Sequence, residues 1–205
     1  MASILIDVVK KPDPKFDYED AKKVADTLVA SLEPFCDKIN IAGSIRRQKP
    51  LVKDIEIVCL PKKVFFQTEL FGEGKLYVIP DFHKALREVT ETVVKGNVDG
   101  RYCQIKLKSG IALDLFLPQP DDYYRQYAIR TGSGDYSRFK IAQGWRKKGW
   151  CGTQSGLRKI SECYQDGKTW KCYNQEAELP PVWESEEHFF DWLGIKWIKP
   201  YERNI

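Results

Sequence analysis

Three acidic residues stand where two predicted strands can bring their side chains together. Asp54 and Glu56 lie two apart in residues 54–60, whose alternating apolar pattern predicts a strand, so both carboxylates leave one face. Asp114 interrupts the apolar stretch 111–117, where an unpaired charge is costly to bury. We expect the three carboxylates to converge if these strands are neighbours. Hard oxygen ligands of this kind favour Mg²⁺ or Mn²⁺ over zinc, and two such ions stabilise the attacking and leaving oxygens of a phosphoryl transfer.

An anion-binding turn is predicted shortly before the first acidic pair. Gly43 and Ser44 follow a predicted strand and open a short helix, where backbone N–H groups and the serine hydroxyl would bind an anion. Arg46 or Arg47 would add a charged fork. Each feature alone also has a plain structural explanation: a turn, a solvated arginine or a salt-bridged acid. Their order along the chain favours a phosphate-binding turn beside a metal site.

These residues must be positioned by elements that the sequence also predicts. The expected strands are residues 3–9, 38–42, 54–60, 102–108 and 111–117, the last two forming a hairpin around Ser109 and Gly110. The expected helices are residues 17–35, 82–93, a segment ending near residue 148, and 185–193 with Gly194 as its stop; a β region separates the last two. A proline-rich break at residues 118–122 is the predicted domain boundary, giving domains 1–120 and 121–205.

Composition and charge narrow the class of protein. With 205 residues, 42% hydrophobic and 30% charged, the chain is typical of soluble globular proteins, and no apolar run is long enough to span a membrane. We therefore expect an intracellular protein with reduced cysteines. Residues 121–175 contain 11 Lys and Arg against 5 Asp and Glu, a net +6 interleaved with aromatic residues. This pattern fits either a phosphate-binding surface or a solvated helix face.

The motifs together resemble one known family. Residues 41–47 (IAGSIRR) and 53–58 (KDIEIV) resemble the nucleotidyltransferase signature of family X DNA polymerases, the group of DNA polymerase beta and terminal transferase. Residues 109–115 (SGIALDL) are similar to the third-carboxylate strand of that family, and 131–133 (TGS) to its palm-to-thumb turn. Residues 197–204 (WIKPYERN) are similar to its C-terminal tail. The resemblance covers nearly the whole chain.

The resemblance implies an α+β fold in two parts and a polymerase activity. A nucleotidyltransferase palm, a mixed sheet with helices on one face, would be followed by a small α/β thumb. The implied reaction is Mg²⁺-dependent addition of deoxynucleotides from dNTP to a primer 3′-OH, as in a small gap-filling repair polymerase. About 40 residues precede Gly43, so we expect neither a lyase nor a fingers domain, as in the reduced viral enzymes. A DNA-bound monomer is the expected state.

Site residues are carried over by their positions in the motifs. Asp54, Glu56 and Asp114 would be the catalytic metal ligands, Asp114 also helping to activate the primer hydroxyl. The implied nucleotide-binding residues are Gly43, Ser44 and Arg47 at the β- and γ-phosphates, and Gly132 and Ser133 at a turn beside the sugar that contains a cis peptide in the family. The basic residues best suited to contact DNA phosphates are Arg138, Lys140, Arg146, Lys147 and Lys148.

Two departures from the family pattern affect what we expect. Glu56 stands where the family usually has aspartate, which shifts the carboxylate oxygens by one methylene. Ile129 and Arg130 occupy positions where the polymerases typically carry an aromatic residue against the sugar. We therefore expect weak discrimination between ribose and deoxyribose, with Arg130 contacting the nucleotide instead.

Three readings of the function stay open at the level of sequence. A template-directed gap- or end-filling DNA polymerase is the leading one. The alternatives are a template-independent terminal transferase or a nucleotidyltransferase acting on RNA, a protein or a small molecule, and a catalytically inactive nucleic-acid-binding protein. The thumb-like segment argues against a small-molecule enzyme, and the presence of all three carboxylates argues against an inactive protein.

Overall fold

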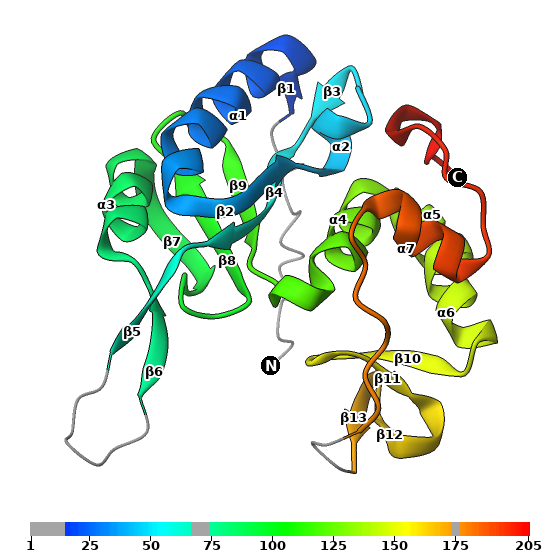
Figure 1. Cartoon of the computed structure of the whole chain (residues 1–205). Helices are drawn as coiled ribbons and strands as arrows, with labels where there is room; N and C mark the ends of the chain where they lie inside the picture. The colour runs from blue at the N-terminus through cyan, green and yellow to red at the C-terminus, as the bar shows by residue number, and fades with distance from the viewer. Residues whose placement is uncertain (1–14, 67–73, 174–176) are drawn as a thin grey trace, which may run out of the picture.

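The computed structural model describes residues 15–66, 74–173 and 177–205, and it has the α+β class that the sequence predicts (Figure 1). The predicted strand 3–9 lies outside the described residues. The helices are α1 (Tyr18–Leu32), α2 (Gly43–Arg46), α3 (Pro80–Val89), α4 (Tyr123–Thr131), α5 (Gly134–Tyr136), α6 (Gln143–Lys147) and α7 (Glu186–Leu193). Short 3₁₀ turns are η1 (Glu33–Phe35), η2 (Pro120–Asp122), η4 (Ile160–Glu162) and η5 (Pro200–Glu202), and η3 (Ser137–Ala142) is a π-helical turn.

The first half of the described chain forms a mixed five-stranded sheet, the sheet unit, in the order β2-β4-β9-β8-β7. Its strands are β2 (Cys36–Ile41), β4 (Asp54–Pro61), β7 (Thr90–Gly96), β8 (Tyr102–Leu107) and β9 (Ala112–Phe116). Strands β4 and β9 run parallel, and the other neighbours are antiparallel. The predicted hairpin is present, because Gly110 takes the positive φ of 88° that the turn between β8 and β9 needs.

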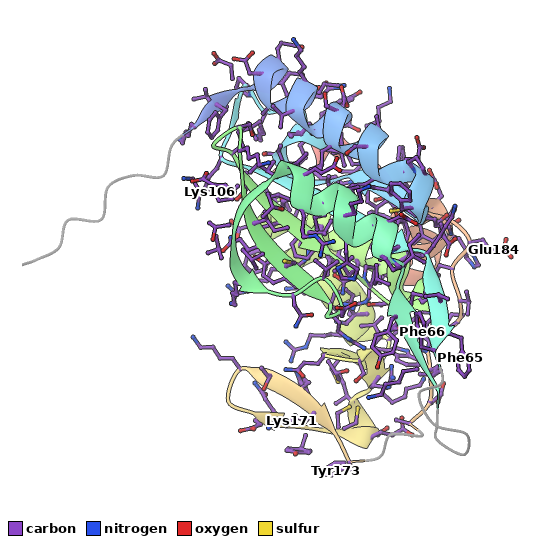
Figure 2. The ribbon with its side chains drawn as sticks, turned by 90° about the vertical axis from the view of Figure 1, so that its left-hand side faces the viewer. Phe65, Phe66, Lys106, Lys171, Tyr173 and Glu184 are labelled. Carbon is purple, nitrogen blue, oxygen red and sulfur yellow. The ribbon has the colours of Figure 1, made fainter. Side chains whose placement is uncertain are left out.

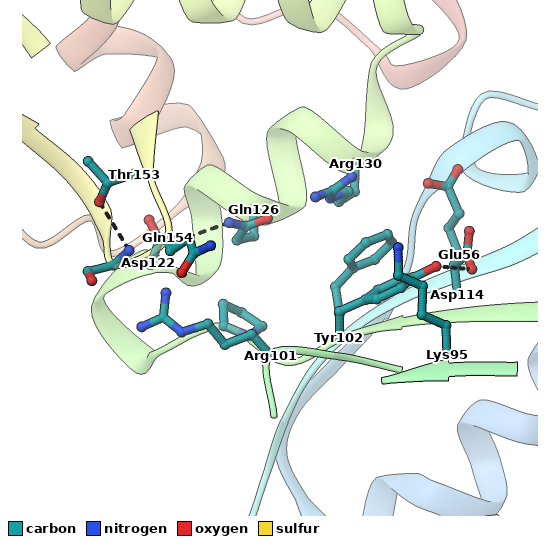
Figure 3. A pocket seen from close by; sticks show the side chains of 13 residues that line it. Glu56, Lys95, Arg101, Tyr102, Asp114, Asp122, Gln126, Arg130, Thr153 and Gln154 are labelled. Atoms are coloured by element: carbon teal, nitrogen blue, oxygen red, sulfur yellow. Dashed lines mark hydrogen bonds between the residues drawn. The ribbon is translucent and has the colours of Figure 1, made fainter. Parts of the chain in front are cut away.

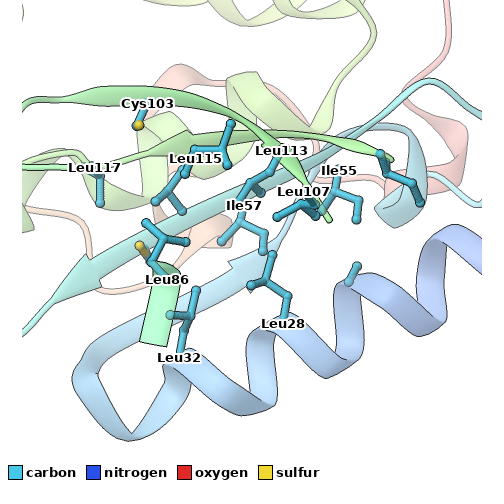
Figure 4. Close-up of a cluster of buried hydrophobic side chains, with 14 of the residues drawn as sticks. Leu28, Leu32, Ile55, Ile57, Leu86, Cys103, Leu107, Leu113, Leu115 and Leu117 are labelled. Carbon is cyan, nitrogen blue, oxygen red and sulfur yellow. The ribbon is translucent and has the colours of Figure 1, made fainter. Parts of the chain in front are cut away.

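Helices α1 and α3 cover one face of this sheet (Figures 1 and 4). Alternate residues of the central strands, among them Ile55, Ile57, Leu113 and Leu115, are fully buried against the apolar stripe of α1. Burial of each such side chain contributes about 1.5–3 kcal/mol relative to exposure. Because the apolar residues point toward the helices, the residues between them must point to the opposite, open face.

The second half, the C-terminal unit, packs helices α4 to α7 with a small four-stranded sheet in the order β11-β10-β13-β12. These strands are β10 (Trp150–Thr153), β11 (Gly156–Lys159), β12 (Cys163–Asp166) and β13 (Thr169–Cys172). A separate aromatic-rich cluster buries Trp145, Trp150, Phe189 and Phe190. Helix α7 begins at a Ser185 cap and ends at Gly194, as predicted. The predicted domain limits of 1–120 and 121–205 stay a prediction.

The predicted helix 82–93 is wrong at its C-terminal end. Helix α3 stops at Val89, and Val93 lies in β7, which pairs with β8. Residues 90–94 contain a run of β-branched side chains, which favour strand over helix. Val93 fits the apolar spacing of the helix, but its strand β7 pairs with β8 at the edge of the sheet, so the residue is extended.

Two short ribbons extend from the body on the same side (Figures 1 and 2). Strands β5 (Lys63–Phe66) and β6 (Lys75–Val78) pair with each other, as do β12 and β13. Small strands β1 (Phe16–Asp17) and β3 (Leu51–Val52) pair near the start of α1. In β12 and β13, Cys163 and Cys172 are directly opposite, with their Sγ atoms 3.0 Å apart and unbonded.

None of the helices in the described ranges has the length and apolar character needed to cross a membrane.

Candidate active site

The acidic residues of β4 and β9 lie on the open face of the sheet. In the parallel register, Glu56 stands opposite Asp114, and Asp54 stands opposite Ala112. Because Ile55 and Leu113 are buried beneath the helices, the carboxylates between the apolar residues face away from them. The neighbouring strands on which the predicted convergence depended are therefore present.

Asp114 is held by two side chains from β8 that sequence reasoning missed. The Tyr102 hydroxyl donates a hydrogen bond of 2.8 Å to Asp114 Oδ1 (Figure 3). Gln104 Nε2 donates a second hydrogen bond of 3.0 Å to the same oxygen. Gln104 stands opposite Asp114 in the β8–β9 register. The alternation of β8 was the available signal, since it places Tyr102 and Gln104 on one face.

Burial is the main influence on the pKa of the Glu56 carboxyl group. Burial, then the neighbouring Asp54, raise the pKa of Glu56 to about 7, while Arg130 and Arg47 lower it and Asp114 raises it further. Burial and the neighbouring carboxylates therefore outweigh the effect of the two arginines on the pKa of Glu56.

Gly43 provides the space that the Glu56 side chain occupies. Its φ is +63°, and a Cβ atom added there would lie 1.9 Å from Glu56 Oε2. The first residue of α2 must therefore be glycine both for its backbone conformation and for its contact with the carboxylate. This contact joins the predicted phosphate-binding turn to the predicted metal site.

Three buried donors around the carboxylates have no hydrogen-bond partner among the described residues. They are Ser44 Oγ, Arg47 Nε and Arg130 Nε. Burial lowers the pKa of both guanidinium groups, and Glu56 opposes this effect. Unpaired buried donors are uncommon in proteins, because each costs about 1–3 kcal/mol. Their concentration in one place makes this turn a candidate site for an anion.

Other contacts hold the guanidinium groups of Arg47 and Arg130 in position. Arg47 Nη1 donates to the backbone oxygens of Thr131 at 2.6 Å and Gly132 at 3.1 Å, which joins α2 to the end of α4. The Arg130 guanidinium lies 4.0 Å from the centroid of the Phe116 ring. Both arginines therefore reach the open face in defined positions.

Gly132 and Ser133 serve the local structure of the turn between α4 and α5. Ser133 Oγ accepts a hydrogen bond from Tyr136 N at 3.1 Å and so caps α5, while Ser133 N donates to Arg203 O at 3.0 Å. The described residues contain no cis peptide bond, which corrects the implied cis peptide at this turn.

Arg46, the other candidate fork, is directed elsewhere. Its two terminal nitrogens donate to the Glu186 carboxylate at 2.8 and 2.9 Å, and its guanidinium lies 3.7 Å from the Tyr127 ring centroid. Arg203 binds the same carboxylate at 2.7 and 3.0 Å, and Trp197 Nε1 donates to it at 2.9 Å. Arg46 therefore joins the two units, leaving Arg47 as the arginine at the site.

A cleft of 730 Å³ opens between the carboxylate face and the turn from β10 to β11 (Figure 3). Its lining includes Glu56, Asp114, Tyr102 and Arg130, with Gln154 from the opposite side. A second hollow of 530 Å³ shares Glu56 and Arg130 with the cleft and is lined further by Arg47, Arg138 and Trp145. Glu56 and Arg130 thus line both cavities. The cleft also contains Asp114, whereas the second hollow also contains Arg47 and Arg138.

The five candidate DNA-binding residues all lie on the surface of the C-terminal unit. Arg138 and Lys140 are exposed on η3, while Arg146, Lys147 and Lys148 are exposed at the end of α6 and just after it. Their positions are compatible with phosphate contacts, which stay a prediction.

The donor chemistry of the carboxylates fits Mg²⁺ or Mn²⁺ better than zinc. As the side chains are oriented, no group of three or more His, Cys, Asp or Glu residues in the described ranges is arranged to hold a metal ion. Glu56 is in contact with Gly43, and Asp114 is hydrogen-bonded toward β8. The ligand set is therefore suitable in type but is not a preformed coordination shell.

Comparison with known proteins identifies the C-terminal unit. Residues 127–204 match the family model described as the DNA polymerase beta thumb. No curated protein matches the chain. A thumb of this family indicates an interaction with DNA. The match begins within α4 and includes Arg203 and Glu186, the carboxylate that binds both Arg203 and Arg46. Residues 127–204 are therefore similar to the thumb of DNA polymerase beta, which supports the resemblance to family X polymerases.

Proposed function

We propose that the protein is a nucleotidyltransferase that adds deoxynucleotides from dNTP to the 3′-OH of a DNA primer. The observation that carries the proposal is the pairing of Glu56 with Asp114 beside three unpartnered buried donors. A site for a nucleoside triphosphate needs both carboxylates that bind divalent cations and donors that bind phosphates. The match of residues 127–204 to a DNA polymerase thumb supports DNA as the polymer that is extended.

The three donors would contact different phosphates of the nucleotide. Ser44 Oγ and Arg47 Nε would bind the terminal phosphates, and the Arg130 guanidinium would lie close to the reacting phosphate. Asp54, Glu56 and Asp114 would hold Mg²⁺ or Mn²⁺, which supplies charge stabilisation at the phosphate oxygens. The second hollow, with Arg47 and Arg138, is the basic cavity suited to the triphosphate.

Asp114 would receive the proton of the primer hydroxyl. Both of its recorded hydrogen bonds end at Oδ1, so Oδ2 is the oxygen left for the proton. The 3′ oxygen forms a bond to the α-phosphorus, the bond from that phosphorus to the bridging oxygen breaks, and pyrophosphate leaves. Tyr102 and Gln104 fix the orientation of the accepting carboxylate.

The proposal is tested by offering labelled dNTP and Mg²⁺ or Mn²⁺ with four substrates: a gapped duplex, an open primer–template, single-stranded DNA and RNA. We expect incorporation on the gapped duplex and the open primer–template, directed by the template base. Equal extension of single-stranded DNA would replace the proposal by terminal transfer, and extension of RNA alone by RNA modification. Absence of incorporation on all four would favour an inactive nucleic-acid-binding protein.

Substitution of Gly43 by alanine should reduce incorporation about 100-fold. The new Cβ would lie 1.9 Å from Glu56 Oε2, so the carboxylate must move, and displacement of a catalytic group by about 1 Å has an effect of this size. The control is Gly194→Ala, where φ is also positive at +73° but no atom lies within 4 Å of the added Cβ. Equal incorporation by both variants would show that the contact with Glu56 has no role.

Weak sugar discrimination is the second expectation at this site. Arg130 stacks on Phe116, and Ile129 packs against the core of the C-terminal unit, so neither places an aromatic ring against the sugar. We expect ribonucleotides and deoxynucleotides to be incorporated with efficiencies within about 100-fold, since one extra hydroxyl alone is weakly rejected. Competition between labelled rNTP and dNTP measures the ratio, and strong rejection of the ribose form would contradict the expectation.

A further inference from the structure

The ribbon of β5 and β6 exposes more apolar surface than its small size explains (Figure 2). Phe65 is 60% exposed, Phe66 53%, Leu76 63% and Tyr77 44%. Among the described strands, β5 and β6 pair only with each other. An isolated two-stranded ribbon is only marginally stable, and a concentration of large exposed apolar side chains marks an interaction site.

Aromatic and cationic side chains occur together on the ribbon. The register places Phe66, Tyr77 and Lys75 on one face, with the two rings edge to face and their centroids 6.3 Å apart. Phe65 lies on the other face, where its ring covers the backbone of Gly74, and Lys63 is on that face as well. Strands β5 and β6 contain Lys63 and Lys75 and no acidic residue, while Glu69 and Glu73 stand between the two strands in the sequence. The ribbon is therefore a positively charged strand pair with aromatic surfaces.

The ribbon is also continuous with the candidate active site. Lys63, Leu76 and Val78, on the face of the ribbon opposite Phe66 and Tyr77, line a hollow of 610 Å³. The same hollow includes Arg101 and Pro118, together with the acidic residues Asp37 and Asp99. Arg101 and Pro118 line the cleft that contains Asp114 as well. A polyanion leaving the cleft past Arg101 would thus reach the base of the ribbon.

We propose that the β5–β6 ribbon binds single-stranded DNA that extends from the cleft, with unpaired bases stacking on Phe66 and Tyr77. The bases of a duplex are already stacked on each other, so free aromatic faces select an unpaired segment. Lys75, on the same face as the two rings, contacts the backbone phosphates and gives the binding its dependence on salt. This inference rests on the proposed function for its ligand, but it concerns binding and not incorporation.

The test compares a blunt duplex with the same duplex carrying a ten-nucleotide single-stranded overhang, by fluorescence anisotropy without dNTP or divalent cation. The full chain should bind the overhang substrate about 10-fold more tightly, a typical effect of one stacked base. The variant F66L/Y77L keeps apolar bulk but loses both rings, so it should lose this preference. The variant F66W/Y77W keeps aromatic faces and should retain it, while both variants bind the blunt duplex as before.

Several outcomes would overturn the proposal. Wild-type protein without a preference for the overhang, or F66L/Y77L with the full preference, would exclude base stacking on the ribbon. Sedimentation that shows a dimer dependent on Phe66 and Tyr77 would identify a second copy of the chain as the occupant instead. Since none of these measurements uses incorporation, failure of the nucleotidyl-transfer proposal would be seen separately.

Discussion

Replacement of Asp114 by asparagine is expected to reduce nucleotide incorporation by about 1000-fold or more. The amide oxygen can still accept the hydrogen bonds of Tyr102 and Gln104, so local structure should be kept. The side chain loses its charge and its ability to take the proton of the primer hydroxyl, and loss of such an electrostatic group has an effect of this scale. Single-turnover incorporation measures the rate, and anisotropy measures DNA affinity, which should stay within about 2-fold.

Asp191→Asn is the matched control for this variant. Asp191 is an exposed carboxylate on α7, remote from the carboxylate face, so its removal should leave incorporation unchanged. Incorporation by Asp114→Asn at the wild-type rate would show that Asp114 has no role in catalysis. A parallel loss of DNA affinity and thermal stability would indicate a structural role instead.

Replacement of Glu186 by glutamine should cause the largest loss of stability, about 3–5 kcal/mol. Glu186 is 4% exposed and accepts hydrogen bonds from Arg46, Arg203 and Trp197. The variant leaves two guanidinium groups without their counter-charge, and Arg203 is completely buried. In a chain of this length the melting temperature should fall by roughly 10 °C. Equal melting temperatures for this variant and wild type would contradict the account.

The same carboxylate predicts how stability depends on pH. Burial alone raises its pKa, but the hydrogen bonds from Arg203 and Arg46 outweigh burial and lower the pKa of Glu186 to about 2. A group whose pKa is lower in the folded state stabilises the fold above its unfolded pKa of 4.5. That stabilisation, about 3 kcal/mol, is lost as pH falls from about 4.5 toward 2.

Glu187→Gln separates the effect of this carboxylate from the general effect of acid. Glu187 is the exposed neighbour of Glu186 in the first turn of α7. Chemical denaturation between pH 2 and 6 should show the loss of stability in wild type and in Glu187→Gln. In Glu186→Gln this component should be absent. A full acid-dependent loss in Glu186→Gln would place the titrating group elsewhere.

The central features of the candidate site could be predicted from the sequence because they depend on local periodicity. Alternation puts Asp54 and Glu56 on one face of a strand, and a short hairpin carries the third carboxylate on another strand. The parallel pairing of β4 with β9, which brings the carboxylates together, is a contact between distant residues and was only a condition of the prediction. The α+β class follows from the same patterns. Helix α3 shows the limit, since apolar spacing continued to Val93 while β-branched residues and pairing with β8 made that residue part of a strand.

The missing parts depend on contacts between residues far apart in the chain. The bond from Arg46 to Glu186 crosses 140 residues, and no local pattern distinguishes Arg46 from Arg47. Tyr102 and Gln104 contact Asp114 only through the exact pairing of β8 with β9. Unpartnered donors such as Ser44 Oγ also require the packed structure, because burial defines them.

The most direct test of nucleotidyl transfer measures primer extension and pyrophosphate release in the same reaction, using the full chain, a gapped duplex, one dNTP and Mg²⁺. One pyrophosphate should be released for each nucleotide added to the primer, and neither product should form when the primer ends in a 3′-deoxy sugar. Release of pyrophosphate or phosphate without extension, or the absence of both products with Mg²⁺ and with Mn²⁺, would contradict the account.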